Sequence, residues 1–493
     1  MDGNLRKVDV VFLRVFLAVS VPIAILTCIA LVNRAILRVP PTWSEQVIAL
    51  SAVQSHGIED LYSINHLYAA PFRICIYPPV YLATLKVLGS SIAVGRWISA
   101  AAIFAAALLL LMASRPGPRI AARVLAPVFF LSVFPTLAWN HGSLVKPEFL
   151  AGCFSFAGFV IYLRCGLETH RRLWIPFAGI LCGIALLTKP TSFPVFAAIC
   201  LHLFCLKRFG DLIRLVAATM VLPLAVYAVL FGRTDGGIWV MTISGNAAHL
   251  DIRKIFSFAI QQYMTSGFVA LAIGACAILL IERSQKESDA AALYFLISVA
   301  WFIVAAGRPG SSYSYFFDAV ISGSLVFGTV ILGAVEGRSW IPMTFMIVAA
   351  LPTVLASVPG GLSELVVFSQ DDRKEHAEVM QRLSQVATKP GEYVLSDVFY
   401  ASDVIEAGLR PVVNDSFQYT LMVKNHIISS DPLIRLLRQR QAPYAVFKNT
   451  LDWQRSIGDY WPADVLDYLQ SNYACASTME RRDGSHLMIC ALQ

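Results

Sequence analysis

The chain has 493 residues, of which 57% are hydrophobic and 14% are charged, and its mean hydropathy is +0.64. Soluble proteins average ~25% charged residues, so this composition excludes a water-soluble globule. Residues 1–359 carry 26 Lys and Arg against 15 Asp and Glu, whereas residues 360–493 carry 13 against 17. The basic residues lie between apolar runs and do not alternate with aromatic residues, which argues against nucleic acid as a partner.

Apolar segments long enough for the ~30 Å hydrocarbon core of a bilayer recur along the first three quarters of the chain. The first follows Arg6 and Lys7, and its length indicates a membrane span, because a cleavable signal peptide is not evident there. Eleven spans are predicted, over residues 8–32, 92–113, 124–139, 149–163, 173–187, 190–206, 212–231, 267–281, 290–306, 316–335 and 340–358. The sequence therefore predicts a polytopic α-helical membrane protein, with its transmembrane domain over residues 1–358.

Basic residues mark one side of these spans. Arg115, Arg164, Arg208 and Arg283 stand with other Lys and Arg residues in short loops that are cytoplasmic if the N-terminus is cytoplasmic. This placement agrees with the positive-inside rule. With an odd number of spans, the residues after Pro359 are then expected outside the cytoplasm.

Two long loops, 33–91 and 232–266, fall on the extracytoplasmic side, and long loops commonly carry function. In the first loop, Tyr77-Pro-Pro-Val-Tyr81 opens an apolar segment that ends at Gly89 and is too short to span a bilayer. Because proline suits the first turn of a helix, this segment is predicted as a helix along the membrane interface. Glu45 lies earlier in the same loop.

Ionisable residues at membrane depth are candidate functional groups, because a charge is costly there. Glu148 follows Lys146-Pro147 at the start of a span, where the helix dipole also gives an acid a structural explanation. Lys189 lies in the tight turn 187–191, on the face where the positive-inside rule disfavours a cation. It has two interpretations, an interfacial anchor or a ligand for an anion such as a lipid phosphate.

Three further candidates are predicted on the same extracytoplasmic surface. Asp318 begins a span after Arg308 and the run 311–317, and the helix N-terminus is again a structural explanation for the acid. His141 lies in a predicted loop and has two interpretations, a hydrogen-bond donor at this surface or a polar loop residue without a specific role. The acids and cations of the predicted spans thus gather on one side of the membrane.

Residues 359–493 alternate between short helices and strands, which predicts a small C-terminal α/β domain. Helices are predicted over 371–387, 400–407, 431–441 and 462–472, and strands over 393–395, 444–447, 473–479 and 486–491. Cys475 and Cys490 flank the sequence Arg481-Arg482-Asp483-Gly484. A four-residue loop sets these cysteines opposite each other for a disulfide, whereas a two-residue Asp-Gly turn separates them as free thiols.

Several short sequence elements follow one another along the chain: Ser44-Glu45-Gln46, Tyr77-Pro-Pro-Val-Tyr81 with Gly95-Arg96, Lys146-Pro-Glu148, Leu187-Thr-Lys-Pro-Thr191, residues 311–318, and the tail segments Val394-Leu-Ser-Asp397 and Ala407-Gly-Leu-Arg-Pro411. Taken in this order, they resemble the GT-C superfamily of polytopic glycosyltransferases, which includes protein O-mannosyltransferases and bacterial enzymes that add sugars to lipopolysaccharide. Two positions depart from the family pattern. Relatives commonly have Asp-Glu where this chain has Ser44-Glu45, and some have a lysine where it has Tyr77, which shifts the expected phosphate contact to Lys189 or Arg308.

The resemblance implies an inverting transferase that moves one sugar from a polyprenyl-phosphate donor to a lipopolysaccharide, other glycolipid or protein acceptor. The reaction is expected at the extracytoplasmic face of a bacterial inner membrane. Glu45 is expected to act as the base, with Glu148 as a second catalytic residue; if a divalent metal ion takes part, the same two acids are its candidate ligands. The substrate-binding candidates are Lys189, Lys146, Tyr77, His141, Arg308 and Asp318.

The alternative function is transport or flipping of a lipid-linked sugar, which also needs buried charge and many spans. Transporters often have two related halves with broken helices. The sequence instead has a long first loop and a polar tail. No Walker A motif, Gly-rich dinucleotide motif, HExxH motif or nucleophile elbow occurs in it, so nucleotide and zinc chemistry have no support.

Overall fold

The computed structural model describes residues 2–36, 43–113, 120–137, 144–167, 173–246, 250–257, 268–281, 286–308, 310–335, 343–366, 370–386, 391–481 and 484–493. The chain forms two compact units. The helical unit comprises Met1–Leu37, Arg96–Ala225 and His249–Val366, and the mixed unit comprises Arg38–Gly95, Val226–Ala248 and Val367–Gln493. The first loop therefore groups with the tail rather than with the spans, while the break at Val366 lies close to the predicted domain boundary.

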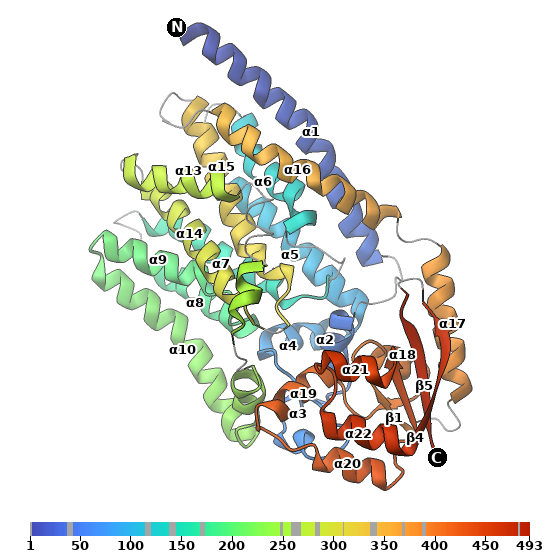
Figure 1. The fold of residues 1–493 in the computed structure, drawn as a ribbon. Helices are drawn as coiled ribbons and strands as arrows, with labels where there is room; N and C mark the ends of the chain where they lie inside the picture. Colours follow the sequence, from blue (N-terminus) through green and yellow to red (C-terminus); the bar gives the residue numbers. More distant parts are fainter. Residues whose placement is uncertain are drawn as a thin grey trace. The chain divides into compact units, whose positions relative to one another are not determined.

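A helix lies at each of the eleven predicted spans (Figure 1). A helix satisfies all its backbone hydrogen bonds internally, as a segment in hydrocarbon must. These helices are α1 (Asp2–Ile36), α5 (Ile92–Ala113), α6 (Ile120–Leu137), α7 (Pro147–Ile161), α8 (Trp174–Thr188), α9 (Pro194–Cys205), α10 (Phe209–Arg233), α13 (Phe268–Ile281), α14 (Lys286–Ala306), α15 (Phe317–Val335) and α16 (Met343–Val366).

Six segments of the described residues are long and apolar enough to cross a membrane, and several of the other helices are shorter but apolar. This confirms a polytopic membrane protein. The short π-helix η2 (Tyr162–Gly166) follows α7, and the 3-10 helix η4 (Tyr313–Phe316) precedes α15. The six segments are Val11–Ile36, Ile92–Ala113, Pro147–Gly166, Phe209–Arg233, Lys286–Ala306 and Tyr313–Gly333.

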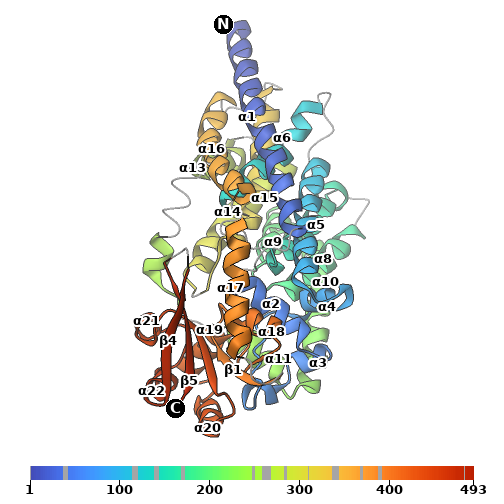
Figure 2. The same ribbon diagram turned by 90° about the vertical axis from the view of Figure 1, so that its right-hand side faces the viewer.

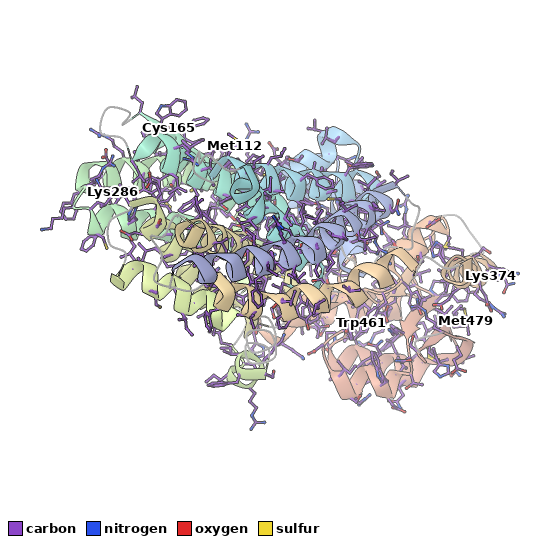
Figure 3. The ribbon with its side chains drawn as sticks, turned by 90° about the horizontal axis from the view of Figure 1, so that it is seen from above. Met112, Cys165, Lys286, Lys374, Trp461 and Met479 are labelled. Carbon is purple, nitrogen blue, oxygen red and sulfur yellow. A yellow bond between two sulfur atoms is a disulfide. The ribbon has the colours of Figure 1, made fainter. Side chains whose placement is uncertain are left out.

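Arg164 in η2 closes the end of a neighbouring helix. Its guanidinium donates hydrogen bonds to the carbonyl oxygens of Met112 and Ala113 at 2.9 and 2.8 Å. Met112 is labelled in Figure 3 beside Cys165. The last carbonyls of α5 have no partner within their own helix, and a basic side chain satisfies them.

An aromatic cluster fills the interior of the helical unit. The ring centroid of Phe317, the first residue of α15, lies 5.1 Å from that of Phe149 and 5.9 Å from that of Phe130. Gly152 of α7 lies against the same ring, and a Cβ there would come within 2.5 Å of Phe317 Cδ1. A residue without a side chain lets α7 and α15 approach closely, so their first turns are held together.

The mixed unit has a five-stranded sheet in the order β2-β1-β3-β5-β4. Strands β1, β4 and β5 are labelled in Figure 2. Strand β1 (Tyr393–Ser396) is parallel to β2 (Arg410–Pro411) and to β3 (Tyr444–Lys448). Strand β5 (His486–Leu492) is antiparallel to β3 and to β4 (Tyr473–Glu480). The predicted α/β tail is confirmed, and its core joins residues such as Val394, Val404 and Val446.

Helices of the tail connect these strands. The predicted helices are present, although the third ends earlier, at Arg438, and the short strand β2 and the helices α19 and α21 were not predicted. The tail helices are α17 (Gln370–Val386), α18 (Ala401–Glu406), α19 (Ser416–Lys424), α20 (Asp431–Arg438), α21 (Leu451–Ile457) and α22 (Ala463–Asn472).

Hydrogen bonds join the first loop to the tail within the mixed unit. Phe72 forms a parallel bridge with Val413. The Asn414 side chain accepts from the Ile74 N–H at 2.9 Å and donates to the Ile74 carbonyl at 3.2 Å. The other elements of this unit outside the tail are α2 (Trp43–Val53), α3 (Ile58–Leu61), η1 (Ile64–Leu67), α4 (Pro79–Leu88), α11 (Gly237–Trp239) and η3 (Val240–Ser244).

Cys475 and Cys490 form a disulfide between β4 and β5. The register near the turn pairs Glu480 with His486, and continued unchanged it would set Cys475 opposite Ala491. An irregularity between residues 477 and 479 shifts the register so that the two cysteines are directly opposite, as a β-bulge does. The pairing thus follows from a bulge, in addition to the turn.

Candidate functional site

Glu148 and Lys189 form a buried ion pair in the helical unit. The Lys189 Nζ lies 3.2 Å from Glu148 Oε1, and the two side chains are only 10% and 8% exposed. Helix α7 begins at Pro147, which places Glu148 in its first turn, and Lys189 caps α8 in an extended conformation. The helix N-terminus favours the acid, and the chain reversal after Thr188 brings the lysine to it.

The surroundings of this pair carry an excess of positive charge. Lys146, the N-cap of α7, acts electrostatically on the Glu148 carboxylate in addition to Lys189. The Lys189 Nζ also lies 5.1 Å from the centre of the Tyr315 ring. Glu148 Oε2 is buried without a hydrogen-bond partner among the described residues. Two lysines around one carboxylate make a place where an anion is favoured.

The turn that carries Lys189 is held by its own backbone and by a neighbouring helix. The Ser192 N–H donates to the Lys189 carbonyl at 3.1 Å, and Trp301 Nε1 donates to the Thr191 carbonyl at 2.8 Å. Helix α9 starts at Pro194 after this turn. Lys189 is therefore a buried, ion-paired residue on a fixed turn.

The remaining candidates of the helical unit have different surroundings. Asp318 is buried in the first turn of α15, and its carboxylate accepts a hydrogen bond from the Tyr294 hydroxyl at 2.7 Å. Arg308 is exposed, and its carbonyl accepts from Lys254 Nζ at 2.9 Å. His141 lies outside the described residues. Asp318 thus has a structural partner, and its role toward substrate stays a prediction.

Glu45 lies in the mixed unit, in the first turn of α2, and is 0% exposed. The next residue, Gln46, accepts a hydrogen bond from the Ser402 N–H at 3.2 Å through its side-chain oxygen. Lys86 of α4 donates to the Ala52 carbonyl at 3.4 Å near the other end of α2, where a cation is favoured. Both ends of the helix that carries Glu45 are therefore fixed.

The predicted interfacial helix is α4, which begins at Pro79 and ends before Gly89. Tyr77 precedes it, and its carbonyl accepts a hydrogen bond from the Tyr62 hydroxyl at 2.6 Å. Val87 and Leu88, at the end of the helix, are among the exposed apolar residues of the chain. Exposed apolar residues suit a helix end that meets lipid.

A charged cluster that sequence reasoning did not assemble holds the first loop. Arg73 donates to both carboxylate oxygens of Asp60 at 3.0 and 3.1 Å, and His66 Nε2 lies 2.8 Å from Asp60. Burial alone would raise the pKa of Asp60, but hydrogen bonds from the His56 N–H, His66 and Arg73 outweigh it and hold the pKa well below its usual range. The separation of these residues along the loop gave no signal of their contact.

Acid is therefore expected to open the first loop. The stability that Asp60 contributes is present above its unfolded-state pKa of 3.8 and is lost as pH falls below that value toward the lower pKa of the folded state. The measurement is labelling of the buried Cys75 thiol by a pyridyl disulfide, which reacts at acid pH, resolved by peptide mass spectrometry. In the wild type, labelling should be faster at about pH 2 than at about pH 6. The Asp60→Asn variant should be labelled rapidly at both pH values. Equal pH profiles for the variant and the wild type would contradict the assignment.

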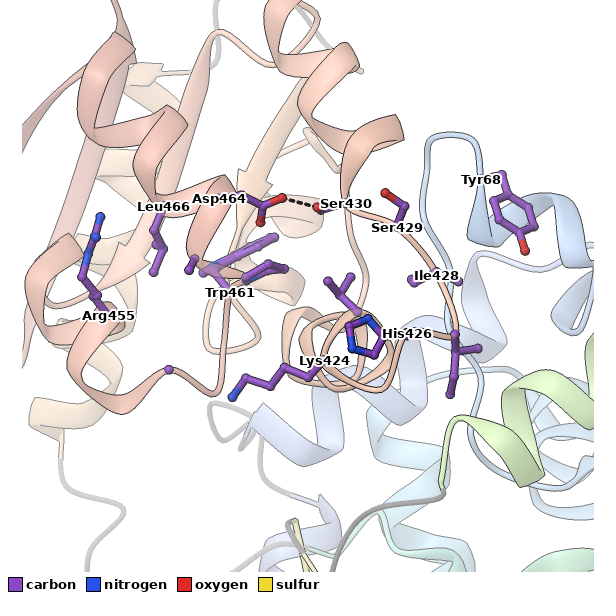
Figure 4. A pocket seen from close by; sticks show the side chains of 15 residues that line it. Tyr68, Lys424, His426, Ile428, Ser429, Ser430, Arg455, Trp461, Asp464 and Leu466 are labelled. Atoms are coloured by element: carbon purple, nitrogen blue, oxygen red, sulfur yellow. Dashed lines mark hydrogen bonds between the residues drawn. The ribbon is translucent and has the colours of Figure 1, made fainter.

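The mixed unit also contains a cavity of about 780 Å³ (Figure 4). Tyr68, Lys424, His426 and Trp461 are among its lining residues. None of the predicted site residues lines it. It is therefore separate from the candidate catalytic groups.

Comparison with known proteins was made on sequence and on structure. No protein-family model matches the chain, and no curated protein matches it. Solved structures do match. The crystal structure of ArnT from Cupriavidus metallidurans bound to undecaprenyl phosphate has 12% sequence identity and a TM-score of 0.57, and covers 96% of this chain and 97% of its own. The apo structure of the same protein has 13% identity and a TM-score of 0.58.

A second match is an Archaeoglobus fulgidus oligosaccharyltransferase in complex with Zn and sulfate, with 11% identity and a TM-score of 0.52 over 94% of this chain and 72% of that one. This chain has a GT-C fold. The expected family resemblance is thereby confirmed at the level of the fold. At such identities the shared GT-C fold carries no residue roles, so the roles of Glu45, Glu148 and Lys189 stay predictions.

Among the described residues, one group of three side chains can supply metal ligands from neighbouring positions, namely His376, Asp403 and Glu406. Sequence reasoning missed this group, although the three-residue spacing of Asp403 and Glu406 on a helix is a signal that could have found it. Glu45 and Glu148 belong to different units, and their role as metal ligands stays a prediction.

Proposed function

We propose that this protein is a membrane glycosyltransferase that transfers one sugar from a polyprenyl-phosphate donor to an envelope acceptor. The observation that carries the proposal is the GT-C fold, shared with ArnT over 96% of this chain and 97% of the ArnT chain, with undecaprenyl phosphate bound in one of the ArnT structures. The acceptor is a glycolipid such as lipopolysaccharide, or a protein.

The lysines around Glu148 support binding of the donor phosphate. Lys189 has three N–H donors, one of which faces Glu148 Oε1 at 3.2 Å. A lysine suits a phosphate as a point charge, and Lys146 adds a second positive charge. We assign Lys189 to the donor phosphate and Lys146 to the same anion, with Arg308, Tyr77, His141 and Asp318 as further substrate contacts.

The chemistry needs a base more than an acid. A carboxylate accepts the proton of the attacking hydroxyl, while the phosphate leaving group requires charge stabilisation. We assign the role of base to Glu45, which is buried at the start of α2. We assign Glu148 to support of the acceptor substrate. In this single displacement the acceptor hydroxyl oxygen forms a bond to the anomeric carbon while the bond between that carbon and the donor phosphate oxygen breaks. The polyprenyl phosphate leaves, and the configuration of the anomeric carbon is inverted. A divalent metal ion held by these acids would add Lewis acidity.

The proposed location is a bacterial inner membrane, with the N-terminus in the cytoplasm and the tail in the periplasm. The Cys475–Cys490 disulfide supports this side for the tail, because disulfides persist in oxidising compartments. The basic loop residues support the same orientation.

The experiment is mass spectrometry of envelope glycolipids, glycoproteins and polyprenyl-phosphate sugars from cells that lack the protein, with and without complementation by the wild type. We expect loss of one sugar mass from an acceptor and accumulation of its lipid donor, both reversed by complementation. An unchanged envelope would contradict the proposal. Flux of a lipid-linked sugar across proteoliposomes without transfer would favour the transporter instead.

A further inference from the structure

Three metal-ligating side chains from two helices of the tail face one another. His376 lies on α17, and Asp403 and Glu406 lie on α18. His376 Nδ1 is 3.7 Å from Asp403 Oδ1, and His376 Nε2 is 3.6 Å from Glu406 Oε2. One ligand atom from each residue lies within 4.8 Å of the others.

Helical periodicity builds this group. Val379 and Leu383 of α17 are buried in the core of the tail, and His376 continues the same stripe toward the N-terminus of that helix at a spacing of three and seven residues. Asp403 and Glu406 are three residues apart, so they share one face of α18. The contact of α17 with α18 then sets the histidine opposite both acids.

The separations within the group are too long for hydrogen bonds, which end near 3.2 Å between N and O. The two separations involve different nitrogens of His376, and one ion would take only one of them. The three ligand atoms that one ion would use lie within 4.8 Å of one another, whereas ligands at about 2.0–2.1 Å from a tetrahedral Zn²⁺ are about 3.4 Å apart. Small side-chain movements would therefore bring one atom of each residue to such an ion.

Asp403 is the residue that most needs a partner. Its side chain is only 9% exposed, and His376 at 3.7 Å is the nearest group that the structure pairs with it among the described residues. A charged carboxylate is unfavourable in a largely buried position unless an opposite charge is near it, and a bound cation would compensate it.

Acidic side chains are in excess around the group, which favours a bound cation. Arg481 acts electrostatically on Asp403, and its Nε is also hydrogen-bonded to Glu375. The acids Glu375, Asp403 and Glu406 thus outnumber it. Glu406 is 62% exposed and His376 is 25% exposed, so the group is open to solvent for entry of an ion.

We propose that His376, Asp403 and Glu406 bind one divalent transition-metal ion, Zn²⁺ by preference, and that this ion joins α17 to α18. An imidazole with two carboxylates suits Zn²⁺, whereas Ca²⁺ and Mg²⁺ prefer oxygen ligands alone. Water completes the coordination. This site is independent of the sugar-transfer chemistry proposed above.

The test uses the full-length protein in detergent, stripped with a chelator, desalted and titrated with Zn²⁺ alone. We expect one zinc ion per chain by elemental analysis, with affinity at least about 10-fold weaker in Glu406→Gln and in His376→Ala. Because Glu406 is largely exposed, its variant keeps the fold. Hydrogen exchange of α17 should slow on zinc binding in the wild type and not in Glu406→Gln.

Matched controls are Glu378→Gln, an acid of α17 that pairs with Arg382 instead at 3.7 Å, and His426→Ala, an exposed histidine of the tail. Both should bind zinc as the wild type does. Co²⁺ gives a second readout, with a visible absorption band that Glu406→Gln weakens and Glu378→Gln leaves unchanged. The proposal is overturned if no zinc binds, or if Glu406→Gln binds zinc and Co²⁺ as tightly as the wild type.

Discussion

Replacement of Glu45 by glutamine should lower turnover at least ~100-fold while the protein still accumulates in the membrane, because removal of a general base commonly reduces rates by 10²–10⁴. Glutamine keeps the size of the side chain and one oxygen, so the packing of α2 should hold. The measurement is the transfer rate of the purified protein with the lipid donor that accumulates in cells lacking it, together with the amount of protein in membranes.

The control for this variant is Glu59→Gln, an exposed acid of the same loop, paired with Arg233. A surface ion pair contributes little, so its turnover should match the wild type. If Glu45→Gln turns over as fast as Glu59→Gln, Glu45 is not the base, even if the protein proves to be a transferase.

Removal of the Lys189 charge should destabilise the protein by about 3–5 kcal/mol, because Glu148 would keep a buried charge without its nearest partner. In Lys189→Met, thermal unfolding of the protein in detergent should occur at lower temperature. The double variant Glu148→Gln/Lys189→Met removes both charges and should recover most of this loss. If Lys189 binds the donor phosphate, the double variant should still show a higher KM for the lipid donor.

Arg214→Met provides the matched control on an ion pair that is more exposed. Arg214 lies 2.8 Å from Asp211 and is 49% exposed, and Asp211 keeps a second partner in Arg208 at 2.7 Å. The loss of Arg214 should therefore change stability by less than about 1 kcal/mol. Equal stability of Lys189→Met and wild type would show that the pair does not need both charges. A stable double variant with an unchanged KM would remove Lys189 from donor binding.

The membrane helices were predictable because apolar runs of fixed length follow directly from the thickness of a bilayer. The tail was predictable where apolar periodicity was strong, as in α17 and β5. Helices α19 and α21 were missed although each has a local signal: Asp415 caps α19 by accepting from the Gln418 N–H, and Thr450 caps α21 by accepting from the Trp453 N–H. Their short length gave little periodicity to read.

The candidate site was predictable residue by residue but not as an arrangement. The sequence predicts Glu148 and Lys189 on the same, extracytoplasmic side of the membrane, because each lies at an end of a predicted span. Their contact depends on how α7 packs against α8, which no spacing along the chain encodes. The same holds for His376 with Asp403 and for the disulfide, whose register depends on a bulge.

The pairing of Ile74 with Asn414 spans 340 residues of chain. During synthesis at about 5–20 residues per second, the first loop emerges roughly 20–70 s before the segment that completes it. During that time the backbone N–H and carbonyl of Ile74 lack their partner in the tail, so they are hydrogen-bonded to water or to another protein. The first loop and the tail thus complete their folding together. A chimaera between relatives should therefore take both segments from the same parent.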